Sequence, residues 1–234
     1  MSTSRPFPDP LQGFLFDMDG TLVDSEALHF ESTNRILAEF GANLSEAEFQ
    51  PYIGMAEEPF WQDLIRRFAL PLPALELAQR RTEALAVRMQ SLSLPPLPGV
   101  LPLLQRIQAA GLPCGVASSS PRAMIEQTLE CAGLTSFFQG WWSGHEDVVH
   151  GKPAPDLYRK AAAALKLKAD RCVAVEDSAT GLASAKAAGL FTVAIPCPSH
   201  PDPKLHGADR LLHSCQELLE AVQDQLSRDS PKPL

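Results

Sequence analysis

The sequence predicts an α/β fold in which a doubly wound parallel sheet carries a small all-α insertion. Short apolar runs at residues 14–16, 112–117 and 172–175 have the length and composition of buried strands. Segments of helical character separate the later runs, and this alternation favours parallel strands joined by crossover helices. Residues 26–93 show helical periodicity, so we expect them to form a separate helical unit.

The expected helices of the insertion have recognisable ends. Ser45 and Glu48 form a capping-box signature, which marks a helix start. The other expected helices of the insertion are residues 25–40, 60–68 and 73–92.

A proline-rich stretch at residues 94–99 ends the helical pattern. We therefore expect a helical cap domain at residues 26–93 and a core domain formed by residues 1–25 and 94–234.

Helices and strands alternate after the insertion. The expected helices are residues 100–110, 121–133 (with Pro121 in the first turn), 156–165, 180–188 and 215–226, and residues 191–195 add a strand. We expect Trp141 and Trp142 to be buried beside a core strand rather than to form a ligand platform. Polar residues at the carboxyl ends of parallel strands meet at one edge of a sheet, where open α/β proteins build their sites.

Two acids, Asp17 and Asp19, follow the first strand. Side chains alternate along a strand, so both acids can face one pocket only if the chain leaves the strand between them, and Gly20 permits that departure. Clustered carboxylates attract a divalent cation, and Mg²⁺ accepts such ligands. On these residues alone, a helix cap at Asp17 and an Asp-Gly turn at Asp19 are an equally good interpretation.

Three further groups of polar residues lie at strand ends or before a helix. They are Ser118, Ser119 and Ser120 after the second strand, Lys152 in a loop stiffened by two prolines, and Glu176 with Asp177 after the third strand. Singly, each has an ordinary alternative: a helix N-cap for Ser118, a solvated lysine for Lys152 and a turn acid for Asp177. Their joint occurrence favours a phosphoryl-transfer site.

These three groups and the two acids after the first strand together resemble the four motifs of the haloacid dehalogenase superfamily. The motifs are DMDGTLVDS from Asp17, Ser118, GKPAPD with Lys152, and VEDS with Asp177. The resemblance implies a Rossmann-like core and an aspartyl-phosphate mechanism. A helical cap between the first two motifs is similar to the branch that includes phosphoglycolate phosphatases, sugar-phosphate phosphatases and β-phosphoglucomutase.

The resemblance also implies residue roles. Asp17 would be the nucleophile, and Asp19 would act first as general acid and then as general base. Ser118 would bond a phosphoryl oxygen, and Lys152 would neutralise charge on Asp17 and the phosphate. The implied Mg²⁺ ligands are Asp17, the backbone carbonyl of Asp19, Asp177 and, as a further or outer-shell ligand, Glu176.

Asp19 favours a phosphate ester as the substrate, because the members of the superfamily that cleave carbon–halogen or phosphonate bonds lack a second acid at this spacing. A phosphatase acting on a sugar or polyol phosphate is the preferred hypothesis, and a β-phosphoglucomutase-like isomerase is the alternative. Glu57 and Glu58 in the cap would repel a second phosphate, which disfavours the mutase. A non-catalytic binding module is a remote third hypothesis, since no acid of the motifs is missing.

The cap is expected to close over the site and to read the leaving group. The candidates for this task are His29, Met55 in the Gly54 loop, Glu57 and Arg81. His29 falls at a position resembling a mutase histidine, although a half-exposed helix histidine is an equally good interpretation.

Composition narrows the classes of partner. A formal net charge of −8 and a pI near 5.2 disfavour nucleic acid or an anionic membrane as the partner. The small phosphorylated metabolite expected as the partner is what the resemblance implies. The 5 cysteines are odd in number and widely spaced, which is typical of reduced thiols, so we expect a cytoplasmic protein. We also expect a monomer, because a cap of this kind can shield its own site. We expect His145, Glu146 and Asp147 to form a solvated turn rather than a metal site.

Overall fold

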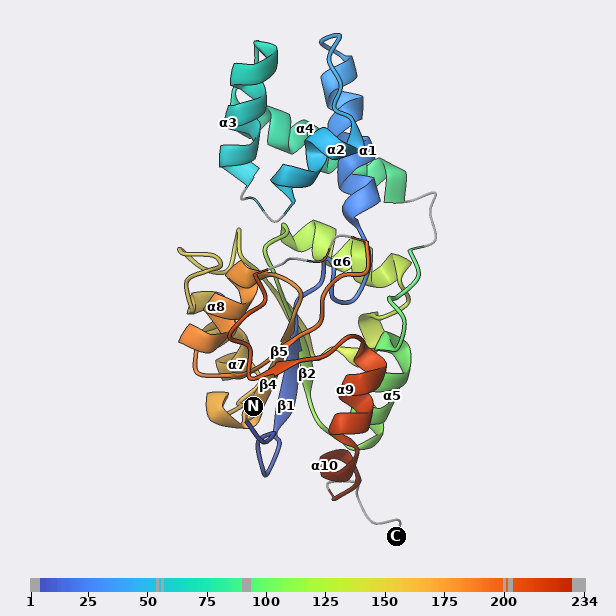
Figure 1. Ribbon diagram of the computed structural model, residues 1–234, viewed down its shortest axis with the longest axis vertical. Helices are drawn as coiled ribbons and strands as arrows, with labels where there is room; N and C mark the ends of the chain where they lie inside the picture. Colours follow the sequence, from blue (N-terminus) through green and yellow to red (C-terminus); the bar gives the residue numbers. More distant parts are fainter. Residues whose placement is uncertain are drawn as a thin grey trace. The chain divides into compact units, whose positions relative to one another are not determined.

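The computed structural model of the protein describes residues 5–53, 55, 57–89, 94–199, 201 and 204–228. The chain forms two compact units: a core unit, Met1–Asp24 with Pro95–Leu234, and a helical unit, Ser25–Leu94 (Figure 1). Gly54 and the end of the expected helix at residues 73–92 lie outside the described residues. That the helical unit acts as a cap domain for the core stays a prediction.

A parallel sheet forms the centre of the core unit. Its six strands in the described residues are β1 (Gly13–Phe16), β2 (Cys114–Ser118), β3 (Gly140–Ser143), β4 (Cys172–Glu176), β5 (Phe191–Ala194) and β6 (Arg210–Leu211). They are arranged in the order β3-β2-β1-β4-β5-β6, and every neighbouring pair is parallel. The predicted α/β class with a doubly wound parallel sheet is confirmed.

The register of the central strands brings their carboxyl ends together. Phe16 of β1 pairs with Val116 of β2 on one side and with Val175 of β4 on the other. The residues that follow these three strands therefore emerge side by side at one edge of the sheet, the edge at which open α/β sheets place their sites.

Helices cover both faces of this sheet. Figure 1 shows α7 and α8 on one side of the strands and α5 and α9 on the other. The helices of the core unit are α5 (Val100–Ala109), α6 (Arg122–Cys131), α7 (Asp156–Ala164), α8 (Ala179–Ala187), α9 (Cys215–Ala221) and α10 (Gln223–Arg228), with 3-10 turns η2 (Thr135–Phe137) and η3 (Ala169–Arg171). Because both faces are buried, β1 and β4 are apolar up to their last residues rather than alternating.

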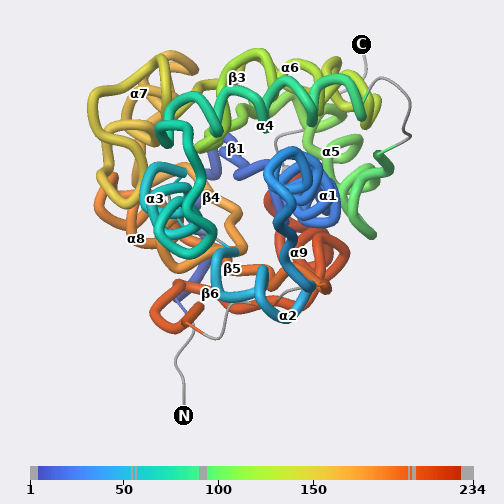
Figure 2. Tube along the Cα trace, turned by 90° about the horizontal axis from the view of Figure 1, so that it is seen from above, coloured from blue at the N-terminus to red at the C-terminus, as the bar shows by residue number. Residues whose placement is uncertain are grey.

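The helical unit has a core of its own. Its elements are α1 (Glu26–Ala38), α2 (Glu46–Phe49), the 3-10 turn η1 (Gln50–Tyr52), α3 (Glu57–Phe68) and α4 (Ala74–Met89). Helices α1 and α3 both pack against α4 (Figure 2), and Trp61 is completely buried among them. The predicted capping box between Ser45 and Glu48 is present at the start of α2. No helix within the described ranges is long and apolar enough to span a bilayer.

Three local predictions were wrong. The strands β3 and β6 were not predicted; both lie at the outer part of the sheet, where strands are short and only partly buried. Pro121 occupies the N-cap of α6, with an extended ψ of 147°, rather than its first turn. The last expected helix is divided at Val222 into α9 and α10.

Trp142 of β3 packs against the cluster beneath α7, and glycines leave room for its ring. A Cβ atom at Gly115 of β2 would lie 2.7 Å from Cζ3 of Trp142 and 3.0 Å from a methyl group of Leu15. A Cβ at Gly140 would lie 2.9 Å from the same indole. Trp142 is half-buried and packs against the core, and it belongs to a strand rather than lying beside one; Trp141 is half-buried too, so the predicted burial is only partial for both.

We expect Gly115→Ala to lower the free energy of unfolding by about 1–3 kcal/mol, because the added methyl group overpacks the space filled by Trp142. Urea denaturation measures the change. In a Trp142→Leu background the same substitution should cost less, since the smaller side chain makes room. Equal losses in both backgrounds would contradict this packing argument.

Candidate functional site

The predicted site residues of the core unit converge at the carboxyl edge of the sheet. Asp17 follows β1 directly, and Glu176 and Asp177 stand at the end of β4, its neighbour. All three are buried, with Asp17 8% and Glu176 0% exposed. Asp17 precedes Glu176 by 159 positions in the sequence (176 − 17), yet it is buried at the same place as Glu176 and Asp177.

These acids form a cluster that could hold a metal ion. One carboxylate oxygen from each of Asp17, Glu176 and Asp177 lies within 4.8 Å of the others. Oxygen donors of this kind suit hard divalent cations better than soft ones. The donor set thus fits the expected type of ion.

Lys152 supplies positive charge inside this cluster. Its Nζ donates to Oδ1 of Asp17 at 2.5 Å and to Oε1 of Glu176 at 2.6 Å, and the side chain is only 4% exposed. Burial works to lower the pKa of Lys152, yet the carboxylates of Asp17 and Glu176 outweigh it and raise the pKa. The lysine therefore stays charged and is no solvated surface residue.

One buried ammonium does not compensate all the carboxylates. Burial raises the pKa of Asp17 to about 7, because the ion pair with Lys152 offsets only part of the desolvation. Burial, together with repulsion from Asp17 and Glu176, raises the pKa of Asp177 well above its usual range. The cluster has an excess of negative charge that an added cation would relieve.

Two further residues hold Glu176: Tyr158, which the sequence did not single out, and Ser178, the last residue of the VEDS motif. The hydroxyl of Tyr158, from α7, donates to Oε1 at 2.6 Å, and Oγ of Ser178 donates to Oε2 at 3.1 Å. Tyr158 is fully buried, and Lys152 Nζ lies 5.2 Å from its ring centroid. Nothing in the local sequence distinguishes this tyrosine from an ordinary core residue, because only the packing of α7 on the sheet brings it to β4.

Glycines make space for the acids. Gly20 adopts a φ of 80°, as the predicted turn after Asp19 requires, and a Cβ there would collide with the carboxylate of Asp177. A Cβ at Gly181, in the first turn of α8, would collide with the carboxylate of Glu176. Gly20 was predicted for its backbone freedom, whereas the steric need at both positions is visible only in the structure.

The three serines after β2 are placed differently from one another. Ser118 is buried, and its Oγ accepts a hydrogen bond from the backbone N–H of Ser120 at 3.0 Å. Ser119 is exposed. The hydroxyl of Ser120 donates to Oδ2 of Asp19 at 2.9 Å, so this serine contacts the expected general acid.

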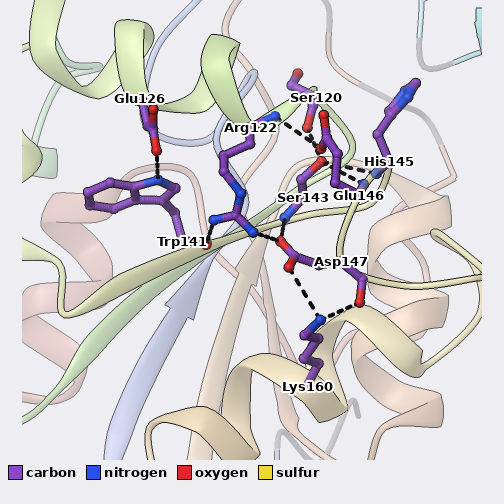
Figure 3. Close-up of polar contacts among 9 residues, drawn as sticks. All are labelled: Ser120, Arg122, Glu126, Trp141, Ser143, His145, Glu146, Asp147 and Lys160. Atoms are coloured by element: carbon purple, nitrogen blue, oxygen red, sulfur yellow. Dashed lines mark hydrogen bonds and ion pairs between the residues drawn. The ribbon is translucent and has the colours of Figure 1, made fainter.

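The turn after β3 is only partly solvated. His145 and Glu146 are exposed, as expected, whereas the Asp147 side chain is 12% exposed and pairs with Arg122 and Lys160 (Figure 3). The expectation of a solvated turn is therefore wrong for Asp147, because two cations from neighbouring helices compensate its burial.

The candidate residues of the helical unit lie on three of its helices and one connecting segment. Arg81 of α4 forms an ion pair with Glu57 of α3 at 2.8 Å, and its guanidinium also lies 5.0 Å from the ring centroid of Phe60. His29 is half-buried on α1, and Met55 is 45% exposed before α3. Two of the expected substrate residues, Glu57 and Arg81, thus bind each other within this unit.

Comparisons with known proteins show the family of the chain. The profile of one protein family, haloacid dehalogenase-like hydrolase, matches residues 11–189. The "Probable pseudouridine-5'-phosphatase" of Drosophila melanogaster is 32% identical over 205 residues, covering 86% of this chain and 88% of that protein. Hexitol phosphatase B of Escherichia coli (strain K12) is 32% identical over 213 residues, covering 90% and 96%.

A solved structure gives the same result for the fold. The crystal structure of CbbY from Rhodobacter sphaeroides in complex with phosphate has a TM-score of 0.80 and 29% sequence identity, and the match covers 91% of this chain and 99% of that chain.

We expect Lys152→Met to lower the free energy of unfolding by about 3–5 kcal/mol at pH 8 in the presence of a chelator, because it removes the cation among buried carboxylates. The loss should be smaller at pH 5.5. A carboxyl whose pKa is raised on folding, as for Asp17 from 3.8 to about 7, favours the folded state at low pH and disfavours it as pH rises through that range.

Urea denaturation at the two pH values measures this difference. Lys168→Met, which removes an exposed lysine, is the matched control and should change stability little at either pH. A loss for Lys152→Met that is the same at both pH values would show that charge compensation is not its role.

Proposed function

Because this chain belongs to the haloacid dehalogenase-like hydrolases, we propose that it is a magnesium-dependent phosphatase that hydrolyses a small phosphorylated metabolite through a phospho-aspartate at Asp17. The predicted superfamily and hydrolase class are confirmed by the family match and the phosphatases among the relatives. The observation that carries the proposal is the buried cluster of Asp17, Glu176 and Asp177 compensated by Lys152, beside the Ser120–Asp19 pair.

In the first half of the reaction, a carboxylate oxygen of Asp17 attacks phosphorus. The bond from that oxygen to phosphorus forms, the bond from phosphorus to the leaving oxygen breaks, and Asp19 gives its proton to the leaving oxygen. The product is the free alcohol, with the phosphoryl group held on Asp17.

In the second half, Asp19 acts as a base. Its carboxylate takes a proton from a water molecule, the water oxygen bonds to phosphorus, and the bond from phosphorus to Asp17 breaks. Inorganic phosphate leaves, and both acids return to their starting states.

The remaining residues position and neutralise the phosphoryl group. The Oγ of Ser118 accepts the Ser120 N–H, so its own proton can be donated to a phosphoryl oxygen. Lys152 contacts Asp17 directly, which suits a role in compensating the charge that gathers on the transferred group.

Magnesium is the proposed cofactor. Asp17, Asp177, the backbone carbonyl of Asp19 and, in a closer or more distant position, Glu176 would hold it, and the oxygen donor set fits. A bound Mg²⁺ would supply positive charge that stabilises the phosphoryl oxygens and keeps the buried carboxylates ionised.

The proposed substrate is a sugar or polyol phosphate, in line with the names of the relatives. The alternative, a β-phosphoglucomutase-like isomerase, needs a grip on a second phosphate. Arg81 is the basic residue among the candidates of the helical unit, and its charge is compensated by Glu57, so the hydrolase is preferred. A role of the helical unit in reading the leaving group, a cytoplasmic location and a monomeric state stay predictions.

With Mg²⁺ and a panel of phosphomonoesters that includes hexitol phosphates, pseudouridine 5'-phosphate and β-glucose 1-phosphate, we expect the wild-type protein to release inorganic phosphate. Asp17→Asn should lower the rate by about 10³-fold or more, since the amide is a poor nucleophile. Asp170→Asn, on the exposed turn η3, is the control and should keep full activity. Conversion of β-glucose 1-phosphate into the 6-phosphate without free phosphate would favour the mutase, and undiminished turnover by Asp17→Asn would exclude the proposed mechanism.

We further expect Mg²⁺ to raise the thermal unfolding temperature of the wild-type protein, and to raise it more at pH 8 than at pH 5.5. Metal binding requires ionised carboxylates, and Asp17 with a pKa of about 7 is mostly protonated at the lower pH. Differential scanning fluorimetry measures both shifts. In Asp177→Asn the shift should shrink at both pH values; a shift of wild-type size there would show that Mg²⁺ binds elsewhere.

A further inference from the structure

A continuous chain of hydrogen bonds joins Asp147, outside the site described above, to Asp19 within it. The chain runs from Asp147 through Ser143 and Ser120 to Asp19, and we call the two serines the serine bridge. Figure 3 shows the outer part of this chain, with cationic side chains from two helices converging on Asp147. None of these contacts is needed to build the sheet, so they call for a separate explanation.

Asp147 is anchored from three elements. Its Oδ2 accepts from Nη2 of Arg122 on α6 at 2.5 Å and from the backbone N–H of Ser143 on β3 at 2.8 Å. Nζ of Lys160 on α7 lies 3.2 Å from its Oδ1 and donates to its backbone oxygen at 2.5 Å. Although burial acts in the opposite direction, the bond from Ser143 and the two cations lower the pKa of Asp147 and keep it ionised.

Ser143 is fully buried and uses its hydroxyl in both directions. Its Oγ donates to the backbone oxygen of Ser120 at 2.8 Å and accepts the backbone N–H of His145 at 3.0 Å. The position is fixed further by strand register, because Ser143 is the β3 partner of Ser118 in β2. The hydroxyl thus ties the loop after β3 to the loop after β2.

Ser120 has each of its polar groups engaged. Its oxygen accepts from Ser143, its N–H donates to Ser118, and its hydroxyl donates to Oδ2 of Asp19. The two backbone contacts fix the place of Ser120, and the contact with Asp19 gives the direction of its hydroxyl. That direction is toward the carboxyl group of Asp19.

We propose that Ser143, held by Asp147, is a positioning residue that acts through Ser120 to orient the carboxyl group of Asp19 for proton transfer. The inference rests on the proposed phosphatase function, in which Asp19 gives a proton to the leaving oxygen. A carboxyl group that rotates away from this oxygen loses its effect as an acid, while attack by Asp17 is untouched.

This role makes a prediction that a merely structural role does not. A leaving group that departs readily as an anion needs no proton, whereas an alkoxide does. Loss of the serine bridge should therefore harm an alkyl phosphate selectively and leave 4-nitrophenyl phosphate nearly unaffected. The ratio kcat/KM reports the steps up to departure of the leaving group, so the later attack of water does not confuse the comparison.

The experiment measures kcat/KM for a hexitol phosphate and for 4-nitrophenyl phosphate with Mg²⁺. For Ser143→Ala we expect a fall of about 10-fold or more with the hexitol phosphate and of about 2-fold or less with 4-nitrophenyl phosphate. Ser143→Thr, which keeps a hydroxyl, should recover most of the loss. Ser120→Ala should show the same selectivity, and combining it with Ser143→Ala should add little, because both act through one contact.

Glu126→Ala is the matched control. It removes another hydrogen bond of the same region, the 3.2 Å bond from Nε1 of Trp141 to Glu126, in which neither Ser143 nor Ser120 takes part (Figure 3). It should affect both substrates equally and weakly. Should Ser143→Ala fail to fold, Asp147→Ala carries the test, since it releases Ser143 from the partly exposed end of the chain and should give the same selective loss.

The outcomes separate the two proposals. Equal losses on both substrates in folded Ser143→Ala, or in Asp147→Ala where that variant replaces it, would overturn the positioning role and leave the phosphatase intact. No phosphate release by the wild-type protein from either substrate would overturn the proposed function and this inference with it. A selective loss with rescue by threonine would support both.

Discussion

The repulsion among three buried carboxylates, and its compensation by one lysine, is the constraint on which the site depends. One carboxylate oxygen from each of Asp17, Glu176 and Asp177 lies within 4.8 Å of the others, and all three residues are buried, where like charges are costly. Lys152 bridges two of them, yet the pKa of Asp17 still rises to about 7. An added cation at this place would relieve the remaining repulsion.

The parallel sheet is the reason that this charge cluster can exist. Register between β1 and β4 puts Asp17 next to the end of the strand that carries Glu176, and helix α7 brings Tyr158 onto the same carboxylate. Covering the sheet on both faces excludes water from the strand ends as well as from the strands. The same packing that stabilises the core therefore also raises the pKa values of the acids at its edge.

A series of hydrogen bonds leads from Asp19, beside the cluster, to the partly exposed Asp147. The serine bridge joins the loops after β2 and β3, and Asp147 connects them to α6 and α7 through Arg122 and Lys160. In the helical unit, by contrast, Arg81 is engaged by Glu57 and by an aromatic ring. Arg122 and Lys160 in the core unit and Arg81 in the helical unit are thus paired with acids. In the part of the chain that the structure describes, Lys152 is the one lysine bound directly to the acids of the cluster.

The sequence by itself determined the central strands, most of the helices and the core residues of the site, because apolar periodicity and spaced motifs are local properties. It identified Asp17, Asp19, Lys152 and the acids at the end of β4. It predicted a solvated turn at Asp147, which is wrong, and it did not single out Tyr158. Only the tertiary structure decided these cases, and it also placed Ser120 against Asp19. Burial and the partners of a side chain depend on which distant elements pack beside it, and that packing is not written in any one segment.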